Sequence, residues 1–199
     1  MKPRLIRSFA GRCCIAIAAI AFCFVGVTAS AAQLAGPSLV VLVRHAEKAS
    51  ATDPDPSLSD AGTARAEALV LAMSHAPPTA IMVSARKRTA ETAAPLATKL
   101  GLTPQVMSLG GPPATHVAAV VTAVRRARGV VLVVGHSNTV PAIIKALGGP
   151  TLPDICDASY ATLYVLQPAR RGQPARLVVG QYGASDPAGA TTCAAMVPM

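Results

Sequence analysis

The stretch that decides the fold is Leu39-Val40-Val41-Leu42-Val43-Arg44-His45-Ala46-Glu47-Lys48. Its first five residues form a continuous apolar run, which is typical of a strand buried on both faces of a parallel sheet. Ligands of open α/β sheets bind just beyond the carboxyl ends of such strands. Arg44 and His45 therefore stand where a ligand is expected, a phosphate-matching guanidinium beside a nucleophile-capable imidazole. From this stretch alone, the alternative that both side chains only solvate a strand end stays open.

The rest of the chain alternates between apolar runs and helical patterns. Further strands are expected at 80–83, 103–107, 130–134, 160–166 and 176–181. Four helices are expected as well. One begins at 58–62, one follows 84–88 and ends near Gly101, and two span 115–128 and 140–147. This alternation predicts an α/β fold, a three-layer α/β/α sandwich with a mainly parallel central sheet. Because 52% of the 199 residues are hydrophobic and only 3% are aromatic, the core must consist of aliphatic side chains.

Residues 1–32 have the layout of a secretory signal peptide. Four basic residues precede an apolar run over 13–27, and small residues then offer cleavage sites after Ala31 or Ala32. We expect 1–32 to be removed and 33–199 to form a periplasmic or secreted domain with no stable membrane span. A retained membrane anchor is the alternative, although the apolar run is short for a full span.

The expected domain is moderately basic, because residues 33–199 keep 14 Lys and Arg and all 9 Asp and Glu, a net charge of +5. Such a charge favours anionic small molecules or an anionic surface. Nucleic-acid binding fits poorly, since aromatic residues are scarce and no long basic run occurs. In an oxidising compartment, Cys156 and Cys193 can form one disulfide, and two unpaired thiols are the alternative.

Polar groups that suit a phosphate follow three of the expected strands. They are Arg44-His45, the segment from Ser84 to Arg88, and His136-Ser137-Asn138. A lone histidine after a strand carries little information, but two of the four histidines in this chain directly follow buried strands. We therefore expect the three strand ends to converge on one pocket.

These motifs together resemble the histidine phosphatase superfamily, also called the phosphoglycerate mutase-like fold. The resemblance rests on Arg44-His45-Ala46-Glu47, on Ser84 and Arg88 followed by Thr92-Ala93, on Gly135-His136, and on Leu58-Ser59-x-x-Gly62. It covers most of residues 39–147. The compact form and the Arg-His-Ala-Glu pattern look like the phosphohistidine phosphatase branch.

The resemblance implies that His45 takes the phosphoryl group and forms a phosphohistidine, with Arg44, Arg88 and His136 around the phosphate oxygens. Elementary chemistry supports these roles, because phosphoryl transfer depends mainly on positioning and charge stabilisation. The nearby arginines should also disfavour imidazolium at His45 and keep its lone pair free. No cofactor is implied, and no metal is required.

Several neighbouring residues have less certain roles. Ser137 and Asn138 follow His136 where a helix N-terminus can contact an anion, or they serve only as helix caps. Arg86 and Lys48 either extend the pocket towards a polyanionic substrate or are simply solvated.

The general acid is the open question of the sequence. An alkoxide leaving group needs a proton donor, yet no Asp or Glu occurs from Thr92 to Pro153. Glu47 is the first substitute and His116 the second, and a surface role for Glu47 is equally open. A missing acid is tolerable if the leaving group is good.

The expected function is therefore an exported, metal-independent phosphatase that hydrolyses a phosphomonoester or phosphoramidate through a phosphohistidine on His45. Its partner would be a small phosphorylated substrate. The alternatives are a non-catalytic binder of phosphorylated envelope ligands and a phosphoglycerate mutase-like phosphotransferase.

Overall fold

The computed structural model describes residues 36–170 and 172–189. The strands are β1 (Leu39–Arg44), β2 (Ala80–Ser84), β3 (Gln105–Met107), β4 (Val130–Gly135), β5 (Thr162–Gln167) and β6 (Arg176–Gln181). The helices are α1 (Asp60–Ala72), α2 (Lys87–Leu100), α3 (Pro113–Arg126) and α4 (Thr139–Ala146). Each element predicted from the sequence is present, with ends that shift by up to two residues. The expected signal peptide and Cys193 lie outside the described residues, so cleavage and the disulfide with Cys156 stay predictions.

The strands form one sheet in the order β3-β2-β4-β1-β5-β6. The first four run parallel, whereas β5 pairs antiparallel with both β1 and β6. The sheet is therefore mainly parallel, with an antiparallel pair at one side. The predicted α/β sandwich is confirmed.

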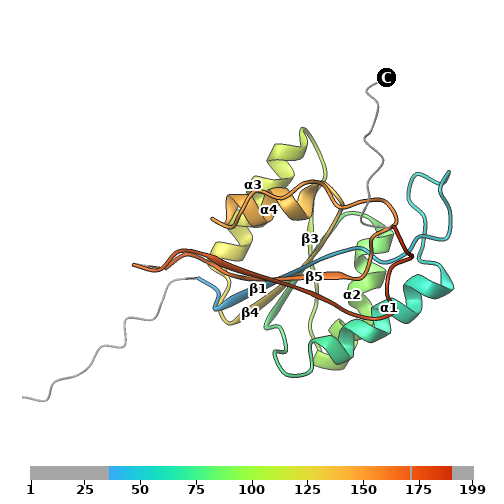
Figure 1. The fold of residues 1–199 in the computed structure, drawn as a ribbon, viewed down its shortest axis with the longest axis horizontal. Helices are drawn as coiled ribbons and strands as arrows, with labels where there is room; N and C mark the ends of the chain where they lie inside the picture. Colours follow the sequence, from blue (N-terminus) through green and yellow to red (C-terminus); the bar gives the residue numbers. More distant parts are fainter. Residues whose placement is uncertain (1–35, 171, 190–199) are drawn as a thin grey trace, which may run out of the picture. The chain divides into compact units, whose positions relative to one another are not determined.

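Helices cover both faces of the sheet, α1 and α2 on one side and α3 and α4 on the other (Figure 1). Successive side chains of β1 point to opposite faces, because strand side chains alternate. Val40 and Leu42 pack in the core beneath α3 and α4, while Val41 and Val43 pack beneath α1 and α2. This double burial explains why the strand shows no polar alternation.

Local sequence signals set the ends of the helices. Ser59 is the N-cap of α1, where its side chain accepts a hydrogen bond from the Gly62 backbone N–H. Helix α2 ends at Gly101, which adopts the left-handed conformation with φ 64° that glycine tolerates. Within the described part of the chain, no helix has the length and apolar character needed to cross a bilayer.

The carboxyl ends of β1, β2 and β4 lie together because these strands are parallel neighbours. They carry Arg44, Ser84 and Gly135, and the next residues along the chain include His45 and His136. The fold thus brings distant sequence motifs to one edge of the sheet.

Candidate active site

A cavity of about 470 Å³ lies at this edge of the sheet. Its lining includes the predicted residues Arg44, His45, Lys48, Arg86, Arg88, His116, His136, Ser137 and Asn138, together with Asp154 and Asp157. The structure therefore brings together all of the predicted site residues except Glu47.

His45 is held as a neutral imidazole. Its Nδ1 lies 2.8 Å from the carbonyl oxygen of Ala46. Because a carbonyl only accepts, Nδ1 carries the proton and Nε2 keeps the lone pair. Burial, together with the positive charges of Arg44 and Arg88, lowers the pKa of His45 to about 4. At neutral pH, His45 is therefore a neutral imidazole with its lone pair on Nε2.

His136 lies edge to face with His45, with ring centroids 5.4 Å apart and an interplanar angle of 63°. Burial and the neighbouring His45 lower the pKa of His136 to about 3. Its Nε2 lies 2.8 Å from Ser84 Oγ. Two imidazoles from different strand ends thus face the same cavity.

The hydrogen bonds beyond His136 fix its tautomer. The Thr89 hydroxyl lies 2.9 Å from the Ser84 carbonyl and 2.8 Å from the Arg86 carbonyl, so its proton goes to a carbonyl. Ser84 must then donate across the 3.0 Å bond to Thr89 Oγ1, and its own Oγ accepts from His136 Nε2–H. Nδ1 of His136 is left as an acceptor, or as a donor once the ring is protonated.

Arg44 is buried and anchored by the loop that follows α4. Its Nη1 donates to the carbonyls of Cys156, Asp157 and Ser159 at 2.7, 2.9 and 3.2 Å. The guanidinium carbon lies 4.3 Å from the centroid of the Tyr160 ring, a cation–π contact. The arginine therefore has a fixed orientation beside His45.

Two donors in the cavity wall have no partner. Among the described residues, Nε of Arg44 and Nε of Arg88 are buried and make no hydrogen bond. Arg88 Nη1 lies 3.6 Å from Asp55 Oδ1, and burial and the charge of Arg86 lower the pKa of Arg88. Both guanidiniums line the cavity and are positively charged, so the cavity suits a bound oxyanion.

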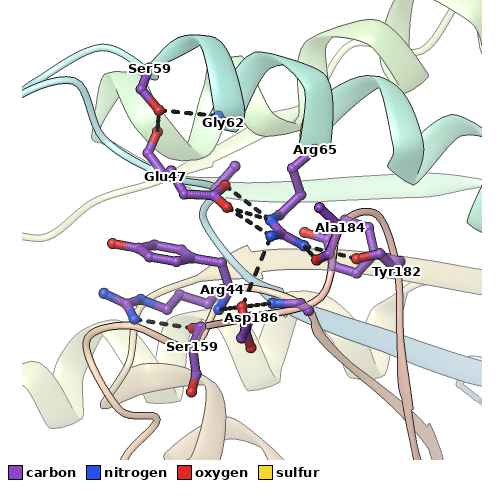
Figure 2. A network of polar contacts seen from close by, with 12 residues as sticks. Arg44, Glu47, Ser59, Gly62, Arg65, Ser159, Tyr182, Ala184 and Asp186 are labelled. Carbon is purple, nitrogen blue, oxygen red and sulfur yellow. Dashed lines mark hydrogen bonds and ion pairs between the residues drawn. The ribbon is translucent and has the colours of Figure 1, made fainter. Parts of the chain in front are cut away.

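Glu47 lies outside this group, in an ion pair with Arg65 (Figure 2). Arg65 Nε donates to both carboxylate oxygens at 3.0 and 2.9 Å, and Nη2 donates to Oε1 at 2.7 Å. Burial alone would raise the pKa of Glu47, but the hydrogen bonds from Arg65 outweigh it and the pKa lies below its usual value. A carboxylate held in this way is a poor proton donor, so the geometry does not favour the acid role predicted for Glu47.

The ion pair belongs to a wider network that the sequence did not reveal. Arg65 Nη1 donates to the carbonyls of Tyr182 and Ala184 at 2.8 and 2.9 Å. Asp186 Oδ1 accepts from the backbone N–H groups of Tyr160 and Ala161 at 2.7 and 2.9 Å, and lies 3.9 Å from Arg65 Nη2. The segment after β6 is thereby fixed to α1 and to the residues that precede β5 (Figure 2).

Other polar side chains line the cavity. His116 is buried there, with Nδ1 donating to the Ser108 carbonyl at 2.8 Å. Asp154 and Asp157, from the loop between α4 and β5, also contribute to the wall and are exposed. Residues 92–153 contain no carboxylate, and the carboxylates in this part of the cavity wall come from the segment that follows them.

Asn138 precedes α4, and its side chain makes no capping hydrogen bond to the described residues. Thr139 Oγ1 instead accepts from the His136 backbone N–H at 2.9 Å. Within residues 36–170 and 172–189, no group of three or more His, Cys, Asp or Glu is placed to hold a metal ion.

Comparison with known proteins agrees with this geometry. Residues 40–108 match the family model of the histidine phosphatase superfamily (branch 1). A search of curated proteins finds no significant match.

Solved structures share the fold at low identity. The mycobacterial glucosyl-3-phosphoglycerate phosphatase complexed with VO3 is 17% identical, with a TM-score of 0.55, over 73% of this chain and 100% of that one. The protein histidine phosphatase SixA complexed with tungstate is 16% identical, with a TM-score of 0.55, over 72% and 96%. A SixA protein of Agrobacterium tumefaciens is 23% identical, with a TM-score of 0.50, over 74% and 98%. The family match and the shared fold together confirm the resemblance to the histidine phosphatase superfamily that the sequence indicated.

Proposed function

We propose that this protein is a phosphatase that hydrolyses a phosphomonoester or phosphoramidate through a phosphohistidine on His45. The observation that carries the proposal is a neutral imidazole whose lone pair is on Nε2, beside two guanidiniums whose buried Nε groups lack partners. A neutral imidazole and two guanidiniums in the lining of one cavity suit the transfer of a phosphoryl group.

In the first step, Nε2 of His45 attacks the phosphorus atom and the bond to the leaving group breaks. Arg44 and Arg88 stabilise the charge on the phosphoryl oxygens without having to move. The negative charge of the substrate raises the pKa of His136, since an opposite charge favours imidazolium. Protonated His136 can then donate from Nδ1 to a phosphoryl oxygen, because Nε2–H is bonded to Ser84.

In the second step, water attacks the phosphohistidine, phosphate leaves, and the lone pair returns to His45. The two arginines supply the charge that a metal ion supplies in other phosphatases, so the proposed reaction is metal-independent. The solved neighbours that hold tungstate and VO3, both oxyanions, lend support to a phosphate-sized site. The proton for a poor leaving group would come from His116, Asp154 or Asp157, which line the cavity.

The decisive test is hydrolysis of an aryl phosphate by the purified protein. His45→Ala should abolish turnover, whereas His75→Ala, at an exposed histidine outside the cavity, should not. Phosphorus NMR of protein mixed with substrate and held at alkaline pH should show a phosphohistidine in wild type only. A chelator such as EDTA should leave the rate unchanged. Undiminished turnover by His45→Ala would refute the proposal.

A non-catalytic binder of phosphorylated envelope ligands is the second candidate. It is favoured by the pairing of Glu47 with Arg65, which removes the expected acid from the cavity. A binder would take up sulfate or phosphate in calorimetry and turn over no ester, including activated aryl phosphates. The two candidates are thus separated by the same assay.

We further propose that the protein is exported. The support is the basic, apolar and small-residue order of residues 1–32. N-terminal sequencing of the protein recovered outside the cytoplasm should begin at Ala32 or Gln33. An intact N-terminus on a membrane-bound form would favour the retained anchor instead.

A further inference from the structure

A second cavity adjoins the candidate active site. It is a groove of about 620 Å³ between α3 and α4. Its aliphatic walls are Ala114, Val117, Ala118 and Val121 of α3 with Ala142 and Ala146 of α4. On each helix these residues recur three or four positions apart and therefore form one continuous face. Alanine at four of the six positions leaves the space open.

The groove adjoins the cavity of the candidate active site. Pro113, Asn138 and Thr139 line both of them, at the start of α3 and α4. At the other end, Arg125 Nη2 donates to the Ala146 carbonyl at 3.1 Å and links the two helices. At 1.5 Å per helical residue, the path from Pro113 to Arg125 is about 18 Å long.

The two cavities differ sharply in chemistry. The first is lined by Arg44, Lys48, Arg86 and Arg88, whereas the walls of the groove are aliphatic apart from Thr122, Arg125 and the shared end. A ligand that fills both must carry a phosphate at one end and an apolar chain along the other. Concave, mostly apolar sites of this size are typical for small organic ligands.

We propose that the groove binds the aliphatic chain of the substrate, so that the substrate is the phosphomonoester of an amphiphilic alcohol, bound as a single molecule. The inference rests on the proposed function, because the phosphate in the first cavity sets the position of the chain. Removing each methylene from water then adds to affinity.

The test uses butyl-, hexyl-, octyl- and decylphosphonate, which are not hydrolysed, at concentrations where each is monomeric. Calorimetric binding to the full chain should tighten by about two- to fourfold per methylene until the groove is filled. Equal affinity for butyl- and decylphosphonate would overturn the inference.

Two matched variants locate the effect. Ala118→Phe places a ring in the groove and should abolish the gain with chain length. Ala119→Phe, at an exposed position of the same helix outside the groove, should retain it. Ala114→Phe replaces the first variant if circular dichroism shows that Ala118→Phe is unfolded. If affinity still increases with chain length in both Ala114→Phe and Ala118→Phe, the inference is also overturned.

The two proposals fail separately. Aryl phosphate hydrolysis with no chain-length effect leaves the phosphatase standing and removes the chain subsite. If binding depends on chain length but no ester is hydrolysed, the proposed chain subsite stands. The protein is then a binder of amphiphilic phosphates and not an enzyme.

Discussion

The rings of His45 and His136 lie 5.4 Å apart and belong to strand ends that are 91 positions apart in the sequence. Each ring has one nitrogen tied to the protein, Nδ1 of His45 to Ala46 and Nε2 of His136 to Ser84. The opposite nitrogen of each ring is therefore the one available for chemistry. This pairing suits the roles in the proposed function, a nucleophile at His45 and a proton-binding partner at His136.

Anion binding should be coupled to proton uptake at His136. In the free protein its pKa is about 3, and a bound dianion raises the pKa, so the complex binds more protons than the free protein. Sulfate, which stays a dianion, should bind more tightly as pH falls from 7 to 5, by at most about tenfold per pH unit for each proton taken up. Calorimetry across pH measures this, and His136→Gln should flatten the dependence. If the sulfate affinity of His136→Gln changes with pH as steeply as that of wild type, the proton is taken up by another group.

The stability of the free protein should fall as pH falls below 6.5. The pKa of His45 is about 4 in the folded state and near 6.5 in the unfolded chain, so the unfolded chain binds more protons in this window. The loss for His45 should reach about 3 kcal/mol at pH 4, from 1.36 kcal/mol per unit of pKa. Urea unfolding in anion-free buffer at several pH values measures it. His45→Gln should reduce the loss, and a pH dependence equal to that of wild type would contradict the cause given.

Replacing the two arginines should have different consequences. Arg44→Lys removes a fork that bonds three carbonyls and should cost about 2 kcal/mol of stability in addition to anion affinity. Arg88→Lys should weaken vanadate inhibition about as strongly but reduce stability less, because the one ion pair of Arg88 among the described residues is the 3.6 Å contact with Asp55. Urea unfolding and vanadate titration give the two values. Equal losses of stability would show that Arg44 is not the anchor of the loop at 156–159.

Glu47→Gln should slow aryl and alkyl phosphates by the same factor. Glu47 is held by Arg65, so it positions the loop behind His45 and does not supply the leaving-group proton. The ratio of kcat/KM for the two substrates measures this directly. A larger loss for the alkyl ester would restore the acid role that the sequence suggested.

Gly62→Ala should destabilise the protein by about 2 kcal/mol or more, because a Cβ at this position would overlap the carbonyl oxygen of Glu47. Gly180→Ala is the matched control, since a Cβ there meets no atom within 4 Å. Thermal unfolding of both variants provides the comparison. If both variants lose equally little stability, α1 can move away from the loop that contains Glu47 at little cost in free energy.

The strand ends and the residues that follow them were predictable because their signals are local. Buried parallel strands read as apolar runs, and the polar residues after β1, β2 and β4 must then meet at one edge. These positions indicated Arg44-His45, the segment from Ser84 to Arg88, and His136, and the resemblance to the histidine phosphatase superfamily then implied Arg88 within that segment.

The network around Arg65 was not predictable from the same signals. Two of its acceptors are backbone carbonyls 117 and 119 positions away, and a carbonyl carries no residue-type signal. One hint existed, since Arg65 follows Gly62 by three positions and precedes Leu69 by four, and both lie on the buried face of α1. A charged residue on a buried helix face requires a partner. Nothing in the residue pattern distinguishes Glu47 as that partner from the other acidic residues.

The attachment of Arg65 to residues 182–184 has a consequence for the nascent chain. The loop of the nucleophile leaves the ribosome early, whereas the carbonyls that satisfy Arg65 Nη1 follow more than a hundred residues later. Contacts of such long range form late in folding. Synthesis must therefore be almost finished before these hydrogen bonds can form, and a translation product interrupted before Tyr182 would leave Nη1 of Arg65 without these two acceptors.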